Sequence, residues 1–171
     1  MNRKSTPSPA TPPGRLERHG ARILDDARHD PYQAQGKLAE PTRCGTCGAV
    51  YHRGRWQWIE ATQGTRSSDC PACRRVHDGL PAGWLTIEGS YVGPRRADLV
   101  ALARHQAEQE RSEHPLHRIM NVAEDADRIE ITTTDIHLPR RIGEALKRAH
   151  DGELRIDYGK DSYEVRVHWQ R

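Results

Sequence analysis

Two short cysteine motifs decide the fold: Cys44-Gly45-Thr46-Cys47-Gly48 and, further along, Cys70-Pro71-Ala72-Cys73. Two residues between paired cysteines form a tight turn that directs both sulfurs to one point. Two such turns supply four thiolates at about 2.3 Å around a tetrahedral ion. The glycines let the backbone approach that ion, and Pro71 fixes one dihedral angle of the second turn. The spacing therefore predicts a zinc ribbon.

Other uses of four cysteines fit this pattern less well. Disulfides are typical of exported chains, and the stretch Met1–Arg15 lacks the apolar core of a secretion signal. A redox dithiol needs only one of the two pairs. An iron–sulfur cluster uses four thiolates, but paired turns around a strand-rich spacer favour zinc. We expect one structural zinc ion with no open position for water, and its ligands are Cys44, Cys47, Cys70 and Cys73.

Composition limits the classes of protein that the chain can represent. Of its 171 residues 35% are hydrophobic, none is Phe, and the mean hydropathy is −0.91. No stretch approaches the roughly 20 apolar residues that cross a bilayer, so we expect a cytoplasmic protein without membrane contact. So polar a chain has a weak apolar core. A structural zinc ion contributes on the order of 10 kcal/mol in small modules and would compensate for it.

Positive charge is concentrated before the last part of the chain. Residues 1–43 and residues 44–96 each carry a net charge of +3, whereas residues 97–171 carry −3. Arginine outnumbers lysine by 23 to 4. Arginine suits bidentate phosphate contacts and stacking, although a GC-rich genome would also enrich it. Phosphate contacts and a GC-rich genome therefore remain equal explanations of the excess of arginine.

The sequence pattern divides the chain into three parts. Residues 1–40 are rich in proline and poor in apolar residues, which predicts a disordered basic tail. Residues 41–95 predict the zinc ribbon and a following strand. Within them, Ala49–Ile59 is expected to be a strand between the cysteine pairs. Residues 96–171 predict an α+β domain.

Periodicity places the elements of the last two parts. Helical spacing is found at 97–112 and after Pro139, and alternation typical of strands at 84–88, 128–135, 154–158 and 163–169. Gly93-Pro94 is expected to close the strand at 84–88. Residues 120–124 are either the hairpin partner of 128–135 or a short helix. We therefore expect an α+β fold, in which a zinc ribbon is followed by a small, mostly antiparallel sheet with one or two packed helices.

Cations and aromatic side chains alternate in the segment Tyr51–Trp58. On one strand the tryptophans share a face and the arginines the other, and such a surface stacks bases while it neutralises phosphates. The tryptophans equally suit the small core of the ribbon. Arginine pairs also follow the second cysteine pair and begin the last helix, where their charge opposes the helix dipole. The candidate nucleic-acid-binding residues are Arg53, Arg55, Trp56, Trp58, Arg74, Arg75, Arg140 and Arg141.

The sequence does not predict an enzyme. It contains no Gly-rich phosphate loop, nucleophile elbow or His-Glu-x-x-His motif, and its ten histidines form no catalytic set. His52 and His77 each follow a cysteine pair closely, but four cysteines already complete a zinc site. We therefore expect a non-catalytic protein without a small-molecule substrate.

Three strings of sequence are distinctive. They are Trp84–Val92, Glu113–Met120 (EHPLHRIM) and Ile131–Gly143 (ITTTDIHLPRRIG). With the cysteine pairs, they make residues 44–169 resemble the N-terminal part of the archaeal and eukaryotic large-ribosomal-subunit export adaptor family, and small bacterial proteins similar to it. The resemblance implies a zinc-dependent module that docks on ribosomal RNA and protein without catalysis. The adaptors carry further cysteine pairs and nuclear-transport signals that this chain does not show, so export is not implied.

Together, these observations predict a non-catalytic zinc-ribbon RNA-binding protein that associates with the ribosome. Its expected partners are ribosomal RNA and, as a second contact, a ribosomal protein. Two alternatives remain open. In a protein–protein adaptor the zinc ribbon would be a rigid clip and the acidic α+β part would make the contacts, whereas a DNA-binding regulator would prefer a duplex.

Overall fold

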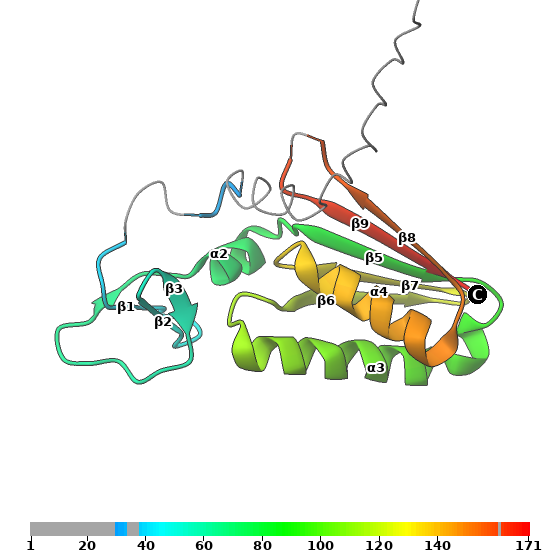
Figure 1. Cartoon of the computed structure of the whole chain (residues 1–171), viewed down its shortest axis with the longest axis horizontal. Helices are drawn as coiled ribbons and strands as arrows, with labels where there is room; N and C mark the ends of the chain where they lie inside the picture. Colours follow the sequence, from blue (N-terminus) through cyan, green and yellow to red (C-terminus); the bar gives the residue numbers. More distant parts are fainter. Residues whose placement is uncertain (1–29, 34–37, 161) are drawn as a thin grey trace, which may run out of the picture.

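The computed structural model describes residues 30–33, 38–160 and 162–171. Figure 1 shows two parts, a small one that we call the knob (residues 38–80) and a larger one that we call the sheet domain (residues 82–171). The fold is α+β, as the sequence predicted, and the knob is consistent with a zinc ribbon. The disorder predicted for residues 1–40 falls largely outside the described residues. Among the residues described, no helix is both long and apolar enough to span a membrane.

The knob is a sheet of very short strands followed by a helix. The strands are β1 (Thr42–Arg43), β2 (Val50–His52), β3 (Arg55–Gln57) and β4 (Arg66–Ser67), in the order β3-β2-β1-β4. The helix α2 (Pro71–Asp78) begins at the second cysteine pair, where the side chain of Cys70 accepts a hydrogen bond from the backbone N–H of Cys73. Pro71 occupies the first turn, where a missing N–H costs no helical bond. The sequence around the cysteines thus places both sulfurs at the helix N-terminus.

The segment that was predicted to be one strand, Ala49–Ile59, contains a β-hairpin. β2 and β3 pair in antiparallel register with Tyr51 opposite Trp56. Arg53 and Gly54 form the turn, with φ values of 52° and 77°. Two positive φ values are typical of the two-residue turn whose twist matches that of its strands. Arg53 is therefore a turn residue, and the predicted face shared by the arginines of a single strand does not exist.

The sheet domain contains five strands in the order β6-β7-β5-β9-β8. The strands are β5 (Gly83–Glu88), β6 (Ile119–Asp125), β7 (Arg128–Thr133), β8 (Glu153–Tyr158) and β9 (Val165–Gln170). β5 and β9 are parallel and the other three pairs are antiparallel, so the prediction of a mostly antiparallel sheet is confirmed. The segment left open between strand and helix is the edge strand β6. β5 is the central strand of this sheet, so the boundary between the two parts lies near residue 81 rather than after residue 95.

Two helices, α3 (Val92–Glu113) and α4 (His137–His150), cover one face of this sheet (Figure 1). α3 begins five residues before its predicted start, because Pro94 lies in its first turn, where proline is tolerated, and does not close the preceding strand. Alternate side chains of the three inner strands form the core against the helices; they are Leu85, Ile87, Ile129, Ile131, Val165, Val167 and Trp169. The end of α3 and the chain that follows it face the knob.

Candidate metal centre

The four cysteine sulfurs come together at one point of the knob. Cys44 and Cys47 lie between β1 and β2, and Cys70 and Cys73 lie at the start of α2. Their Sγ atoms are all within 4.8 Å of one another, and those of Cys47 and Cys70 are 3.8 Å apart. This distance matches the edge of a sulfur tetrahedron whose centre lies about 2.3 Å from each corner. All four residues are free cysteines rather than disulfides, so the group can bind a metal ion.

Backbone N–H groups are directed at these sulfurs. The N–H of Cys70 donates to Cys44 Sγ at 3.3 Å, and that of Cys73 donates to Cys70 Sγ at 3.4 Å. In the first turn Gly48 adopts a φ of 83°, which returns the chain so that Cys44 N donates to the carbonyl of Ala49 at 2.7 Å. Donors to sulfur stabilise the thiolate over the thiol, and the thiolate is the form that binds metal.

A cation from the sheet domain, Arg118, also contacts the sulfurs. Its guanidinium donates to Cys47 Sγ at 3.1 Å, to Cys73 Sγ at 3.2 Å and to Cys70 Sγ at 3.6 Å. Burial raises the pKa of the Cys47 thiol, but the N–H of Ala49 and then Arg118 lower it more, to about 7. At Cys70 and Cys73 burial prevails and raises the pKa. Of these three thiols, that of Cys47 therefore ionises most easily.

Sequence reasoning missed Arg118. The residue lies 45 positions after Cys73, and no local spacing relates an arginine in a loop to a distant cysteine pair. Its string, Glu113–Met120, was distinctive only through the resemblance to the adaptor family. A cation that faces four thiolates is expected on electrostatic grounds, but only the tertiary fold shows which of the chain's arginines takes that place.

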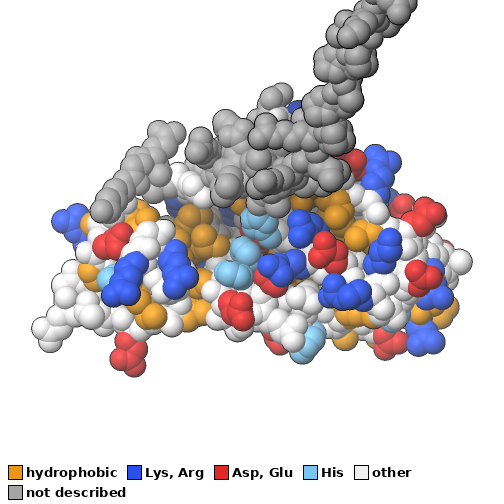
Figure 2. Space-filling view, viewed as in Figure 1, with side chains coloured by type: hydrophobic (Ala, Val, Ile, Leu, Met, Phe, Trp, Pro, Cys, Tyr) orange, Lys and Arg blue, Asp and Glu red, His pale blue; other side chains and the backbone are white. Residues whose placement is uncertain are grey.

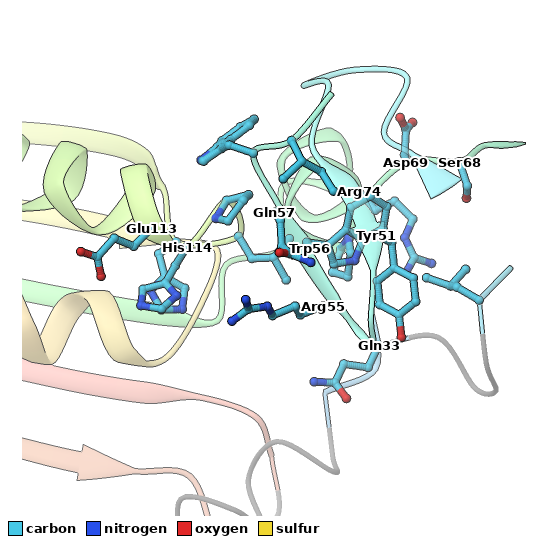
Figure 3. Close-up of a pocket in the computed structure, with 18 of the residues that line it drawn as sticks. Gln33, Tyr51, Arg55, Trp56, Gln57, Ser68, Asp69, Arg74, Glu113 and His114 are labelled. Atoms are coloured by element: carbon cyan, nitrogen blue, oxygen red, sulfur yellow. The ribbon is translucent and has the colours of Figure 1, made fainter. Parts of the chain in front are cut away.

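A cleft of about 670 Å³ lies beside the metal centre, between the knob and the sheet domain (Figure 3). Its knob wall comes from the β2–β3 hairpin and the start of α2, and its other wall from residues 112–117 at the end of α3. In Figure 3, Arg55 extends from the knob toward the side of the cleft that carries His114. The residues that line it include Tyr51, Arg55, Trp56, Trp58, Arg74, His114 and His117.

Five of the candidate nucleic-acid-binding residues are exposed, one of them, Arg141, on α4 and the other four on the knob. Arg53 is at the tip of the hairpin, and Arg55 and Arg74 line the cleft. The guanidinium of Arg74 also donates to the carbonyl of Tyr32 and stands 5.7 Å from the centre of that ring. Trp58 is 39% exposed. The cleft thus combines an accessible indole with two accessible guanidinium groups.

The indole of Trp58 also contacts the sheet domain. Its Nε1–H donates to the carbonyl of Arg111 at 2.6 Å, and the guanidinium of Arg111 lies 5.7 Å from its ring centre. Trp56 is different, since it is only 9% exposed and packs against Cys44 and Cys70 in the core of the knob. Of the two tryptophans, Trp56 therefore follows the core interpretation, and Trp58 remains available to a ligand.

The other arginine candidates are engaged within the chain. Arg75 is 3% exposed, forms an ion pair with Asp30, and lies 4.4 Å from the ring centre of Tyr32. Burial and pairing leave it no surface for a phosphate, so we withdraw it from the predicted contacts. On α4, Arg140 pairs with Glu144 at 3.0 Å and Arg141 with Glu110 at 3.2 Å. Neither of these two is among the residues that line the cleft.

Histidine side chains gather where the knob meets the sheet domain (Figure 2). The rings of His114, His117 and His137 form a row, with centres 4.7 Å and 5.6 Å apart. His117 lies between two carboxylates, 3.4 Å from Glu110 and 3.7 Å from Asp135. Burial lowers the pKa of His117 to about 4 and raises that of Asp135 to about 6. His117 is therefore neutral at pH 7 and adds no charge to the cleft.

Comparisons with known proteins identify no relative: no family model, curated protein or solved structure matches the chain significantly. The similarity to the ribosomal export adaptors therefore stays a prediction that rests on the strings quoted above. The metal centre and the cleft are the features from which a function can be argued.

Proposed function

We propose that this protein is a non-catalytic, cytoplasmic RNA-binding protein whose knob is held together by one zinc ion. Four sulfur donors at tetrahedral separation suit zinc better than the hard cations, which prefer oxygen. With all four positions taken by cysteines, the ion would have no site for water or substrate, so its role would be structural. Zinc would thereby fix the β2–β3 hairpin against α2 and so form the knob wall of the cleft.

The observation that supports RNA binding is the placement of Trp58 near two arginines. Trp58, Arg55 and Arg74 line one cleft and are all exposed. A base stacked on an aromatic ring contributes about 1–3 kcal/mol, and guanidinium groups pair with the phosphates on either side of such a base. The cleft has a volume of about 670 Å³, and stacking on a side chain requires a base that is not already stacked within a helix. Single-stranded RNA is therefore the proposed ligand.

Ribosomal RNA is the first RNA to test. The string EHPLHRIM, on which the resemblance to the ribosomal adaptors partly rests, supplies one wall of the cleft through Glu113, His114, Pro115, Leu116 and His117. The part of the sequence that suggests ribosome association thus lies where the chemistry suggests an RNA site. We propose association with the ribosome on this coincidence.

Binding of a fluorescent single-stranded RNA, followed by anisotropy over a salt series, tests the proposal. The double variant Arg55→Gln/Arg74→Gln should lose at least tenfold in affinity and reduce the slope of log K against log salt by about 1.4, because each lost phosphate contact accounts for about 0.7. The matched control is Arg140→Gln/Arg141→Gln, which removes the same charge outside the cleft and should bind like the wild type. Binding without salt dependence, or equal losses in both double variants, would contradict the proposal.

Sedimentation of a lysate with tagged protein tests the ribosomal part separately. We expect the wild type to migrate with ribosomal particles at low salt, and both raised salt and the Arg55→Gln/Arg74→Gln variant to shift it to the top of the gradient. Wild-type protein that stays at the top at low salt would contradict ribosome association. RNA binding in solution is tested by the anisotropy measurement alone.

One observation favours the protein–protein adaptor as a second candidate. Arg75, Arg140 and Arg141 are ion-paired within the chain, so fewer cations are free for RNA than the sequence suggested, and residues 97–171 carry a net charge of −3. An adaptor would bind one protein partner with little dependence on salt. A preference for duplex DNA over single-stranded RNA in the anisotropy measurement would instead indicate a DNA-binding regulator.

A further inference from the structure

We propose that Arg118 is the charge partner of the metal centre and that it couples metal binding in the knob to docking of the sheet domain. No part of this proposal depends on RNA, since metal binding and docking are both measured without it. Arg118 lies in the chain between α3 and β6. Its role is to position the two parts rather than to coordinate the ion.

The backbone of Arg118 belongs to the sheet domain. Its N–H donates to Thr134 Oγ1 at 3.0 Å, and its carbonyl accepts a hydrogen bond from the N–H of Thr134, also at 3.0 Å. Within the side chain, Nε donates to the carbonyl of Pro115 at 2.7 Å. These three bonds fix the base of the side chain and its direction before the guanidinium reaches the knob.

The guanidinium group of Arg118 contacts the metal centre. One terminal nitrogen donates to Cys73 Sγ, and the other donates to both Cys47 Sγ and Cys70 Sγ. Every nitrogen of the guanidinium therefore has an acceptor, and two of the three face sulfur. A planar fork with donors on both ends can span three sulfurs at once, whereas a lysine ammonium is a point charge that cannot reproduce this geometry.

The charge of a loaded centre explains why a cation is placed there. Four thiolates around one divalent ion leave two net negative charges, and a guanidinium that donates to thiolates forms hydrogen bonds roughly twice as strong as neutral ones. Without the ion, nothing holds the four sulfurs together at one point, so the half-buried guanidinium loses acceptors that are fixed in place for it. Docking should therefore favour the loaded knob, and by reciprocity the docked domain should favour retention of the metal.

Two neighbouring contacts make the coupling local to one segment. Leu116 packs against the core of the knob, and the carbonyl of Arg111 accepts the hydrogen bond from Trp58. Together with Arg118 they lie within eight residues, so one segment, residues 111–118, makes all three of these contacts with the knob. The same segment forms a wall of the cleft. Metal loading should therefore set how this wall is held against the knob.

The first measurement is the rate at which the zinc-loaded full chain releases zinc to a chromogenic chelator. Removing a group that hydrogen-bonds metal ligands typically costs 10–100-fold in metal affinity. We expect Arg118→Gln to release zinc at least tenfold faster than the wild type. Arg104→Gln is the matched control, because Arg104 is exposed on α3 and is not among the cleft-lining residues. It should release zinc at the wild-type rate.

The second measurement is hydrogen exchange of peptides that cover residues 111–119, with zinc and after its removal. In the wild type, zinc removal should speed exchange of this segment at least tenfold, although it contains no metal ligand. In Arg118→Gln the segment should already exchange fast with zinc bound, and removal should add little. Peptides from the core of the sheet domain, such as those covering β7, should change in neither protein.

Two results would overturn the proposal. One is an Arg118→Gln protein with wild-type zinc release and wild-type exchange in the loaded state. The other is a response of residues 111–119 to zinc removal that is equally large with and without Arg118. If Arg118→Gln does not fold, the variant Arg118→Lys is used to test the proposal. Its side chain keeps the positive charge, but its single ammonium group contacts only one sulfur at a time. Faster zinc release than in the wild type would support the proposal, and an unchanged rate would overturn it.

Discussion

The knob and the sheet domain are stabilised by different means. The buried core of the sheet domain contains sixteen residues around fully buried Trp169, whereas that of the knob contains six, three of them cysteines. The strands of the knob have two or three residues, and those of the sheet domain six or seven. Burial of apolar area can stabilise the larger part by itself, but not the smaller. The contrast shows where a low apolar content is compensated by a metal ion.

The largest expected effect is unfolding of the knob while the sheet domain stays folded. The double variant Cys47→Ser/Cys70→Ser removes two of the four sulfurs, and structural zinc contributes on the order of 10 kcal/mol to such modules. We expect the knob to unfold while the sheet domain keeps its native state. Amide NMR spectra with residue assignments measure this, and the wild type after chelation of zinc should give the same pattern. Loss of native signals from β5, β7 and β9 would contradict the separation.

The reverse experiment weakens the sheet domain alone. Trp169 is fully buried and its Nε1–H donates to the carbonyl of Asp151 at 2.8 Å, so Trp169→Ala should lower the free energy of unfolding of this domain by about 3–5 kcal/mol. Denaturant titration measures the loss. Trp84 is the matched control, because it is only partly buried and lies on the other face of β5 beside Arg166. A Trp84→Ala loss as large as that of Trp169→Ala would contradict the account of the core.

Variants of Trp58 test whether a base stacks in the cleft between the knob and the sheet domain. Trp58→Ala removes a half-exposed indole and its bond to the carbonyl of Arg111, so RNA affinity should fall by about 1–3 kcal/mol. The knob should keep one zinc ion per chain, which mass spectrometry of the native protein measures. Trp58→Phe retains the stacking surface without the N–H and should recover most of the affinity. RNA affinity unchanged in Trp58→Ala would show that bases do not stack there.

Acid acts on the sheet domain through His117. Burial lowers the pKa of His117 to about 4, so the folded state binds its proton less well than the unfolded state, whose pKa is near 6.5. Its contribution is complete above pH 6.5 and is lost as the pH falls toward 4. A pKa difference of about 2.5 corresponds to about 3 kcal/mol. The difference in unfolding free energy between wild type and His117→Gln should therefore change by up to about 3 kcal/mol over this range, to the disadvantage of the wild type. A difference independent of pH would contradict the assignment.

Much of the fold could be predicted because its signals are local. Cysteine spacing identified the metal group, and alternation of apolar residues identified β5, β7, β8 and β9 with nearly correct bounds. The hairpin in the knob was missed because Arg53 takes a positive φ, which arginine seldom does. The position of β5 was missed because its parallel pairing with β9 joins strands far apart in sequence, and alternation shows that a strand is half-buried, not which strand it pairs with.

The candidate site was predictable only in part, for a related reason. The cysteine pairs define their own site, because each pair fixes its geometry within one turn. Whether an arginine is free for a ligand depends on partners that are distant in the sequence. Arg75 is paired with Asp30, 45 residues before it. Arg118 contacts the sulfurs from the sheet domain. The sequence shows how many cations there are, whereas the tertiary structure decides which of them remain free for a ligand.

The most direct test of the account is ultraviolet crosslinking of the zinc-loaded protein to single-stranded RNA, followed by mass spectrometry of the linked peptides. The account predicts crosslinks to the peptide that carries Arg55 and Trp58 and to the peptide that carries His114, because these residues line the two walls of one cleft. The Arg140→Gln/Arg141→Gln protein should give the same crosslinks. Crosslinks confined to α4 or to the sheet face opposite the helices, or none above those of the zinc-free protein, would contradict it.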